Sequence, residues 1–112
     1  MTNAVEIRHY IGRSGKDVFD DWLSELTDIR AQAKIAARVN RLAAGNFGDC
    51  KSLGRGLYEL RIDWGPGYRV YYATTGQSRV LLLCAGDKRT QAADVARAHE
   101  YLTDYRARTK RK

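Results

Sequence analysis

The chain has 112 residues, of which 44% are hydrophobic, which suits a single domain with a modest core. It contains no apolar run of about 18 residues that would cross a membrane and no secretory signal at its N-terminus, so we expect a cytoplasmic protein without membrane contact. The formal net charge is +7, and residues 57–112 contribute +5 of it, with 11 Lys or Arg against six Asp or Glu; such a chain is attracted to a nucleic acid, an acidic membrane surface or an acidic protein.

The first half of the chain predicts one strand followed by two helices. Apolar and polar residues alternate over residues 5–10, which is a strand pattern. Ser14 is the expected N-cap of the first helix, with Asp17 in the capping-box position. Thr27 or Asp28 is expected to cap the second helix. A loop rich in Gly and Asp then leads into the second half.

The second half predicts three strands and a last helix. The strands cover residues 57–62, 68–74 and 79–86, and the turn between the first two has the sequence DWGPG. Thr90 is expected to cap a helix over residues 91–107. The third strand is apolar throughout, which indicates a strand buried on both faces.

The order β-α-α-β-β-β-α predicts an α+β fold, with a mostly antiparallel sheet and helices packed on one side. We expect one domain over residues 1–106 and a basic, mobile tail over residues 107–112. Cys50 and Cys84 lie far apart and show neither a CxxC pattern nor zinc-ligand spacing. We therefore expect two reduced thiols, no metal site and no cofactor.

The predicted hairpin over residues 57–72 places two arginines against each other. A five-residue turn pairs Ile62 with Tyr68, and the same register sets Arg61 opposite Arg69 and Glu59 opposite Tyr71. Like charges directly across a strand pair are destabilising. Either this face binds an anion, or Glu59 partly neutralises the pair and the long side chains splay into water.

More cations are expected at the same end of the sheet. The turn after the second hairpin strand predicts that Cys84 lies opposite Arg69. Lys88 and Arg89 then emerge beside the two arginines and directly before the last helix, whose N-terminus favours anions. This convergence suits a phosphodiester backbone, since arginine binds phosphate with two hydrogen bonds.

Other residues could extend this surface into an RNA-binding site. Lys51 and Arg55 lie in the loop that enters the first hairpin strand and add positive charge. Tyr71 and Trp64 could stack on unpaired bases, although Trp64 suits packing in the core equally well. On the second helix, Arg38 and Arg41 predict a solvated polar face, with docking of a partner as the alternative.

Two segments of the chain resemble a family of bacterial toxins. The segments KSLGRGLYELRIDWGPGYRVYY and LLLCAGDKRTQAADVARAHEYL resemble the RelE/ParE superfamily of type II toxin–antitoxin toxins, and within it the HigB-like addiction module killer proteins. The resemblance covers about residues 4–106. It implies a compact toxin that is held inactive by a cognate antitoxin encoded in the same operon.

The resemblance also implies roles for individual cations. Arg61 matches an arginine at the end of the first hairpin strand of RelE-like nucleases, and Arg69 matches the arginine of a GYR element. Lys88 or Arg89 matches a basic residue after the last strand. In such nucleases these residues bind the phosphate and stabilise the charge of the transition state.

The proton-transferring groups of RelE have no direct counterparts in this chain. RelE has lysines on the first hairpin strand, one of which serves as the base, whereas here that strand offers Leu57 and Glu59 on the same face. Other members use a carboxylate or a histidine, so Glu59 is the candidate general base and Asp49 a second candidate. RelE also has a tyrosine early in its last helix, and Tyr101 lies too far along to match it.

Three functions remain open from the sequence. The first is an mRNA interferase, a metal-independent endoribonuclease in which the 2′-hydroxyl of mRNA attacks the adjacent phosphate, with mRNA on the 70S ribosome as the expected target. The second is a ParE-type inhibitor of DNA gyrase without nuclease activity. The third is a basic nucleic-acid-binding module without toxicity.

Overall fold

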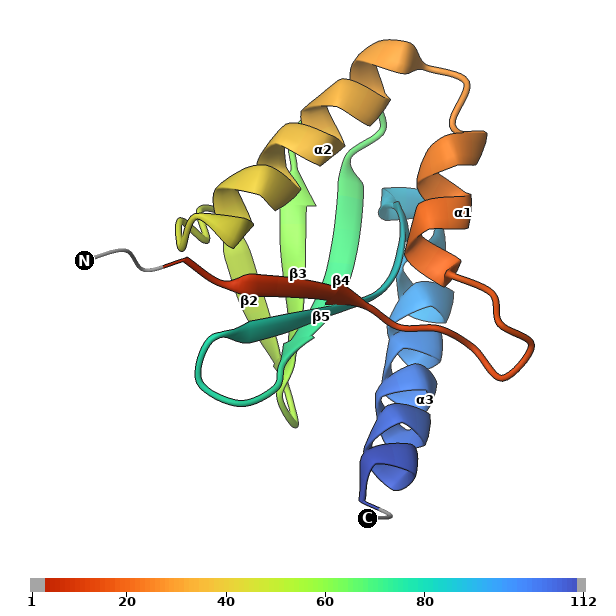
Figure 1. Ribbon diagram of the computed structural model, residues 1–112. Helices are drawn as coiled ribbons and strands as arrows, with labels where there is room; N and C mark the ends of the chain where they lie inside the picture. Colours follow the sequence, from red (N-terminus) through yellow and green to blue (C-terminus); the bar gives the residue numbers. More distant parts are fainter. Residues whose placement is uncertain (1–3, 111–112) are drawn as a thin grey trace.

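The computed structural model describes residues 4–110 and contains one five-stranded sheet and three α-helices (Figure 1). The strands are β1 (Glu6–His9), β2 (Cys50–Gly54), β3 (Leu57–Ile62), β4 (Tyr68–Thr74) and β5 (Arg79–Asp87). The helices are α1 (Val18–Glu25), α2 (Ile29–Ala43) and α3 (Gln91–Thr109), with a short 3-10 turn, η1 (Lys88–Thr90), before α3. None of the described helices combines the length and apolarity needed to cross a membrane.

The strands lie in the order β1-β5-β4-β3-β2. β1 runs parallel to β5, and the other three neighbouring pairs are antiparallel. The predicted α+β fold with a mostly antiparallel sheet is therefore confirmed. β2 was not predicted, because its residues show no apolar alternation and most of them are exposed; its pairing with β3 defines it instead.

The apolar residues form two clusters on alternate residues of the strands. Leu60 and Val70 belong to the cluster that contains the buried residues of α1 and α2. Leu57 and Tyr71 belong to the cluster that contains those of α3. Side chains alternate between the faces of a strand. The one-sided packing expected for the helices therefore describes α1 and α2, whereas α3 packs on the alternate residues.

Aspartates cap the first two helices. The Asp17 side chain accepts a hydrogen bond from the Asp20 amide at the start of α1, and Asp28 accepts two at the start of α2. The expected cap at Ser14 is therefore wrong, whereas Asp28 was one of the two expected caps of α2. A turn occupies residues 12–16 and a bridge joins Ile11 to Asp17, so α1 can begin only after that bridge.

The hairpin register predicted for β3 and β4 is confirmed, from the Ile62–Tyr68 pair to the Tyr58–Tyr72 pair. The register of β4 with β5 differs from the prediction. Thr74 pairs with Val80 in place of Arg79, which moves the register by one residue, and an irregularity between Tyr71 and Tyr72 moves it by one more, so Gly86 lies opposite Arg69 in place of Cys84. A bulge adds one residue to one strand and moves every later partner.

α3 continues to Thr109, so residues 107–109 of the expected tail are helical. Arg108 donates a hydrogen bond to the Ile11 carbonyl oxygen at 2.7 Å and forms an ion pair with Asp104. Residues 111–112 lie outside the described part of the chain.

Candidate phosphate-binding site

Arg61 and Arg69 lie directly opposite each other on β3 and β4, at the end of the two strands that carries the 63–67 turn. Paired residues of neighbouring strands project from the same face, with their Cβ atoms about 5 Å apart. Both arginines line a polar pocket together with Lys88 and Asp49. The structure thus brings together three of the four predicted catalytic residues around one cavity.

Glu59 is buried behind the two arginines, with 2% of its side chain exposed. Its Oε1 lies 4.0 Å from Arg61 Nε and its Oε2 lies 3.6 Å from Arg69 Nε. These distances are those of ion pairs without a hydrogen bond. One buried carboxylate therefore lies against two guanidinium groups, and these three residues together carry a formal charge of +1. Part of the repulsion between the arginines is compensated by the protein itself.

Gln91, the first residue of α3, is the third partner of this carboxylate. Its Nε2 donates a hydrogen bond of 2.6 Å to Glu59 Oε2. Sequence analysis missed Gln91, because its partner lies 32 residues earlier in the chain. The available signal was its position at the first turn of a helix that follows a basic turn.

The arginines keep donors that no residue of the described chain satisfies. Both Nε atoms are buried without a hydrogen-bond partner. The Arg61 side chain is 40% exposed and that of Arg69 13%, so a ligand in the pocket can contact the Arg61 guanidinium directly. A buried donor without a partner costs free energy, and the protein tolerates this cost at both arginines.

Arg38 holds the main chain of Arg61 from α2. It donates hydrogen bonds to the Arg61 carbonyl oxygen at 2.6 Å and to the Phe47 carbonyl oxygen at 3.3 Å. The prediction that Arg38 lies on a solvated polar face is therefore wrong. The signal was present in the sequence, since Arg38 lies three residues after Ile35 and four before Leu42, and both of these are buried.

Asp49 provides an accessible carboxylate at the pocket. Its carbonyl oxygen accepts a hydrogen bond from the Arg61 amide at 2.9 Å, which extends the ladder between β2 and β3. Its carboxylate lies 3.7 Å from Arg61 Nε and is 63% exposed. Of the two candidate bases, Asp49 can meet a substrate, whereas Glu59 is enclosed by its partners.

The basic residues after β5 differ in their surroundings. Lys88 is exposed and lines the pocket. Arg89 is also exposed but donates a hydrogen bond to Asp87 at 3.0 Å. This bond holds the pKa of Asp87 below its ordinary value. Lys88 therefore offers the pocket a charge that no described ion pair compensates, while the charge of Arg89 is balanced locally.

Lys51 and Arg55 lie at different distances from the pocket. Lys51 pairs with Glu59 across β2 and β3, so it projects from the same face as the arginines, and it is exposed. Arg55 lies in the turn at the opposite end of this hairpin. The part of β3 from Leu57 to Arg61, about 13 Å of extended strand, separates this turn from Arg61. Arg55 therefore lies away from the predicted site.

The two aromatic residues proposed to stack on bases lie in the protein interior or against it. Tyr71 is fully buried in the cluster with α3, so it offers no face to a base. Trp64 packs against the other cluster, with Lys34 Nζ 4.5 Å from its ring centroid. The structure corrects the expectation for Tyr71 and favours the packing role for Trp64.

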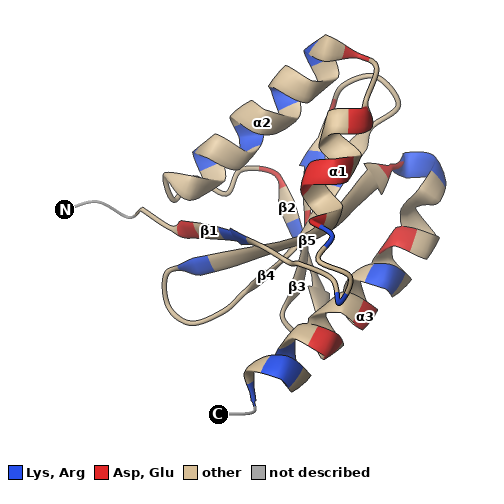
Figure 2. Cartoon of the chain, turned by 45° about the vertical axis from the view of Figure 1, so that its right-hand side comes forward, with Lys and Arg blue, Asp and Glu red and all other residues tan. Residues whose placement is uncertain are grey.

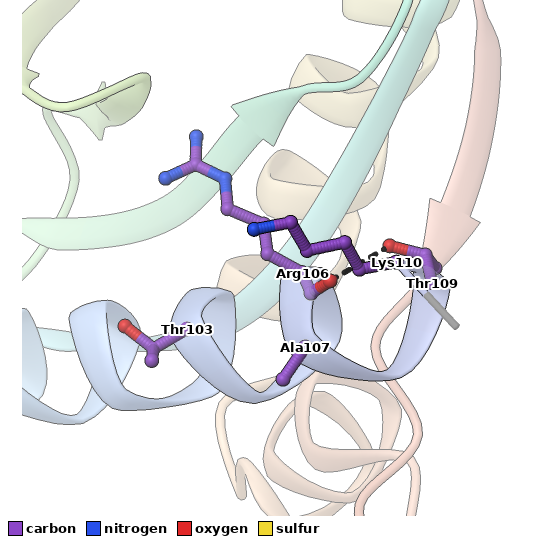
Figure 3. A pocket seen from close by; sticks show the side chains of 5 residues that line it. All are labelled: Thr103, Arg106, Ala107, Thr109 and Lys110. Carbon is purple, nitrogen blue, oxygen red and sulfur yellow. Dashed lines mark hydrogen bonds between the residues drawn. The ribbon is translucent and has the colours of Figure 1, made fainter.

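A second pocket lies at the end of α3 (Figure 3). Its lining residues come from the last turns of this helix and its C-cap: Thr103, Arg106, Ala107, Thr109 and Lys110. Arg106 donates a hydrogen bond to the Arg55 carbonyl oxygen at 2.9 Å. Because one helix alone lines this pocket, it lacks the convergence of elements found around Arg61. Within residues 4–110, no cluster of three or more His, Cys, Asp or Glu side chains could hold a metal ion.

Comparison with known proteins assigns the chain to a family. Residues 21–102 match the family described as phage derived protein Gp49-like (DUF891). The chain belongs to the Gp49-like family. This family is related to the toxins of toxin–antitoxin systems. The matched region of this Gp49-like protein contains the whole cluster around Glu59.

A protein of Haemophilus influenzae, described as uncharacterized, is similar to this Gp49-like protein. The two are 56% identical over 80 residues, which cover 71% of this chain and 81% of the relative. The similarity supports the family assignment, but the description of the relative names no activity.

Proposed function

We propose that this Gp49-like protein is the toxin of a type II toxin–antitoxin system, of the RelE/ParE type and similar to the HigB-like killer proteins, and that it cleaves ribosome-bound mRNA. The observation that carries the proposal is the pair Arg61–Arg69, which shares one face and one pocket with Lys88. Three cations around one cavity suit a single phosphodiester group.

In the proposed reaction, the 2′-oxygen of the RNA forms a bond to the adjacent phosphorus as the bond to the 5′-oxygen of the next nucleotide breaks. Arg61, Arg69 and Lys88 stabilise the negative charge that develops on the phosphate oxygens. Asp49 accepts the proton of the 2′-hydroxyl, because its carboxylate is exposed at the pocket, and the departing 5′-oxygen takes a proton from solvent water. Glu59, the other candidate base, holds the arginines in place.

The test replaces the arginines one at a time. Arg61→Ala and Arg69→Ala should each abolish growth inhibition on induction, since loss of one such donor lowers the rate by about 10²–10³. Primer extension on mRNA, with and without ribosomes, measures cleavage, and circular dichroism checks folding. Arg79→Ala removes an arginine from the other end of β5 and should stay toxic. If both arginine variants fold and remain fully toxic, the assignment is wrong.

The burial of Glu59 favours a second candidate function, inhibition of DNA gyrase in the manner of ParE. The strand that carries the base in RelE offers here a carboxylate that is only 2% exposed. A supercoiling assay with purified gyrase separates the candidates. Inhibition of gyrase while mRNA stays intact supports the second candidate, and cleaved mRNA with active gyrase supports the first.

We also infer an antitoxin partner encoded in the same operon. The relation of the family to toxin–antitoxin toxins supports a partner of this kind. Co-expression of the neighbouring gene should restore growth and yield a complex that copurifies with the toxin. Continued growth arrest in the presence of an expressed neighbouring protein would argue against this partner.

A further inference from the structure

The carboxylate of Glu59 has partners from three different elements. Arg61 comes from β3, Arg69 from β4 and Gln91 from α3. Of these three contacts, that of Gln91 is the shortest, at 2.6 Å, and it is a hydrogen bond. The contacts of the arginine Nε atoms are 4.0 Å and 3.6 Å and are ion pairs alone. Gln91 is therefore the group that orients this carboxylate.

Gln91 itself is carried by a well-anchored turn. The Thr90 hydroxyl donates a hydrogen bond to the buried Asp94 carboxylate, and Arg97 donates another to it at 2.6 Å. Asp94 packs directly on β5, since a Cβ atom on Gly86 would overlap its carboxylate. The first turn of α3 is thus fixed to the strand next to β4, and Gln91 reaches Glu59 from a constrained position.

A buried carboxylate beside two guanidinium groups would normally form short, bidentate hydrogen bonds with one of them. Such a contact would consume the donors of that arginine and draw it away from the pocket. In this protein Gln91 binds Oε2, and both arginine Nε atoms stay beyond hydrogen-bond distance from Glu59. Glu59 therefore leaves the terminal guanidinium nitrogens of both arginines, which line the pocket, available to a ligand.

We propose that Gln91 is a positioning residue that restrains Glu59, so that neither Arg61 nor Arg69 collapses onto the carboxylate and both can bind one phosphate group. This inference rests on the proposed phosphate-binding role of the pocket and adds that a residue of α3 controls the positions of the two arginines. It assigns Gln91 an indirect role, since no step of the reaction requires its contact with the substrate.

The experiment replaces Gln91 by methionine, which has similar length and no N–H donor. In ¹H–¹⁵N spectra of the free protein, the Nε–Hε resonance of Arg61 or Arg69 should move downfield in Gln91→Met, because that group then binds Glu59. Inorganic phosphate, added as the probe, should bind roughly tenfold more weakly, the effect of losing one charge-assisted hydrogen bond. Thr103→Ala, an exposed position on the same helix, should leave both measurements unchanged.

A double-mutant cycle with Glu59→Gln tests whether Gln91 acts through Glu59. Gln91→Met should then have no further effect on phosphate affinity. Unchanged arginine resonances and phosphate affinity in Gln91→Met would overturn the proposal, as would equal changes in Thr103→Ala or phosphate that does not bind the parent protein. None of these measurements depends on RNA cleavage, so a protein that passes them but leaves mRNA intact would refute the nuclease and retain the positioning role.

Discussion

Tyr10 and Tyr71 are both buried, but their hydroxyl groups have different surroundings. The Tyr10 hydroxyl donates a hydrogen bond of 2.6 Å to Asp104. The Tyr71 hydroxyl is buried without a partner among the described residues. Burial raises the pKa of both phenols, so both stay neutral at physiological pH. The same chemical group therefore stabilises the fold at one position and costs free energy at the other.

Tyr71→Phe should leave the free energy of unfolding unchanged or raise it by up to about 1 kcal/mol, because it removes a buried hydroxyl that lacks a partner. Tyr10→Phe, the matched control, should lower it by about 2 kcal/mol through loss of a charge-assisted hydrogen bond. Urea denaturation measures both. Equal destabilisation by the two changes would show that the Tyr71 hydroxyl is bound in solution.

The register of the β3–β4 hairpin was predictable, because turn length and apolar alternation select the same pairing. Its consequence, the Arg61–Arg69 pair, followed from the sequence alone. Gly86 opposite Arg69 did not follow, since the turn pairs Thr74 with Val80 in place of Arg79 and the irregularity after Tyr71 has no sequence signal. Nor did the bond from Gln91 to Glu59, which depends on how α3 docks on the sheet.

The turn between β2 and β3 permits a prediction of its own. Arg55 and Gly56 both have positive φ, 58° and 83°, as in a type I′ turn, which prefers Asn-Gly. Arg55→Asn should raise the free energy of unfolding by roughly 1 kcal/mol, because a non-glycine residue with a long side chain is strained there. Thermal unfolding measures the gain.

The same variant checks whether Arg55 contributes to nucleic-acid binding. Since Arg55 lies at the opposite end of the hairpin from Arg61, Arg55→Asn should bind RNA as the parent protein does, apart from the small effect of one charge. If Arg55→Asn lost as much RNA affinity as Arg61→Ala, Arg55 would be part of the RNA-binding site.

Across the whole molecule, Asp104 joins the N-terminal segment to the last helix. It accepts hydrogen bonds from Tyr10 and Arg13 and pairs with Arg108 on its own helix. Figure 2 shows Lys and Arg at intervals along α2, whereas α3 carries both signs of charge. Positive charge is thus distributed along both helices. On α3, the Asp104 carboxylate connects segments that lie about 90 residues apart in the sequence.

This contact predicts a dependence of stability on pH. The hydrogen bond from Tyr10, followed by those from Arg13, holds the pKa of Asp104 below its ordinary value. Its contribution is therefore complete above the unfolded pKa of about 3.9 and is lost as the pH falls through the lower, folded value. Asp104→Asn should reduce stability at neutral pH and flatten its decline below about pH 4. Parallel curves for parent and variant would contradict this role.

The parallel pairing of β1 with β5 also constrains how the sheet can assemble. Glu6 pairs with Arg79 and His9 with Leu82, so the segments that meet are separated by 73 residues. During translation β1 emerges before β5 and has no neighbouring strand until β5 has left the ribosome. Contacts of such long sequence separation are slow to form, so closure of this edge should be among the last events of folding.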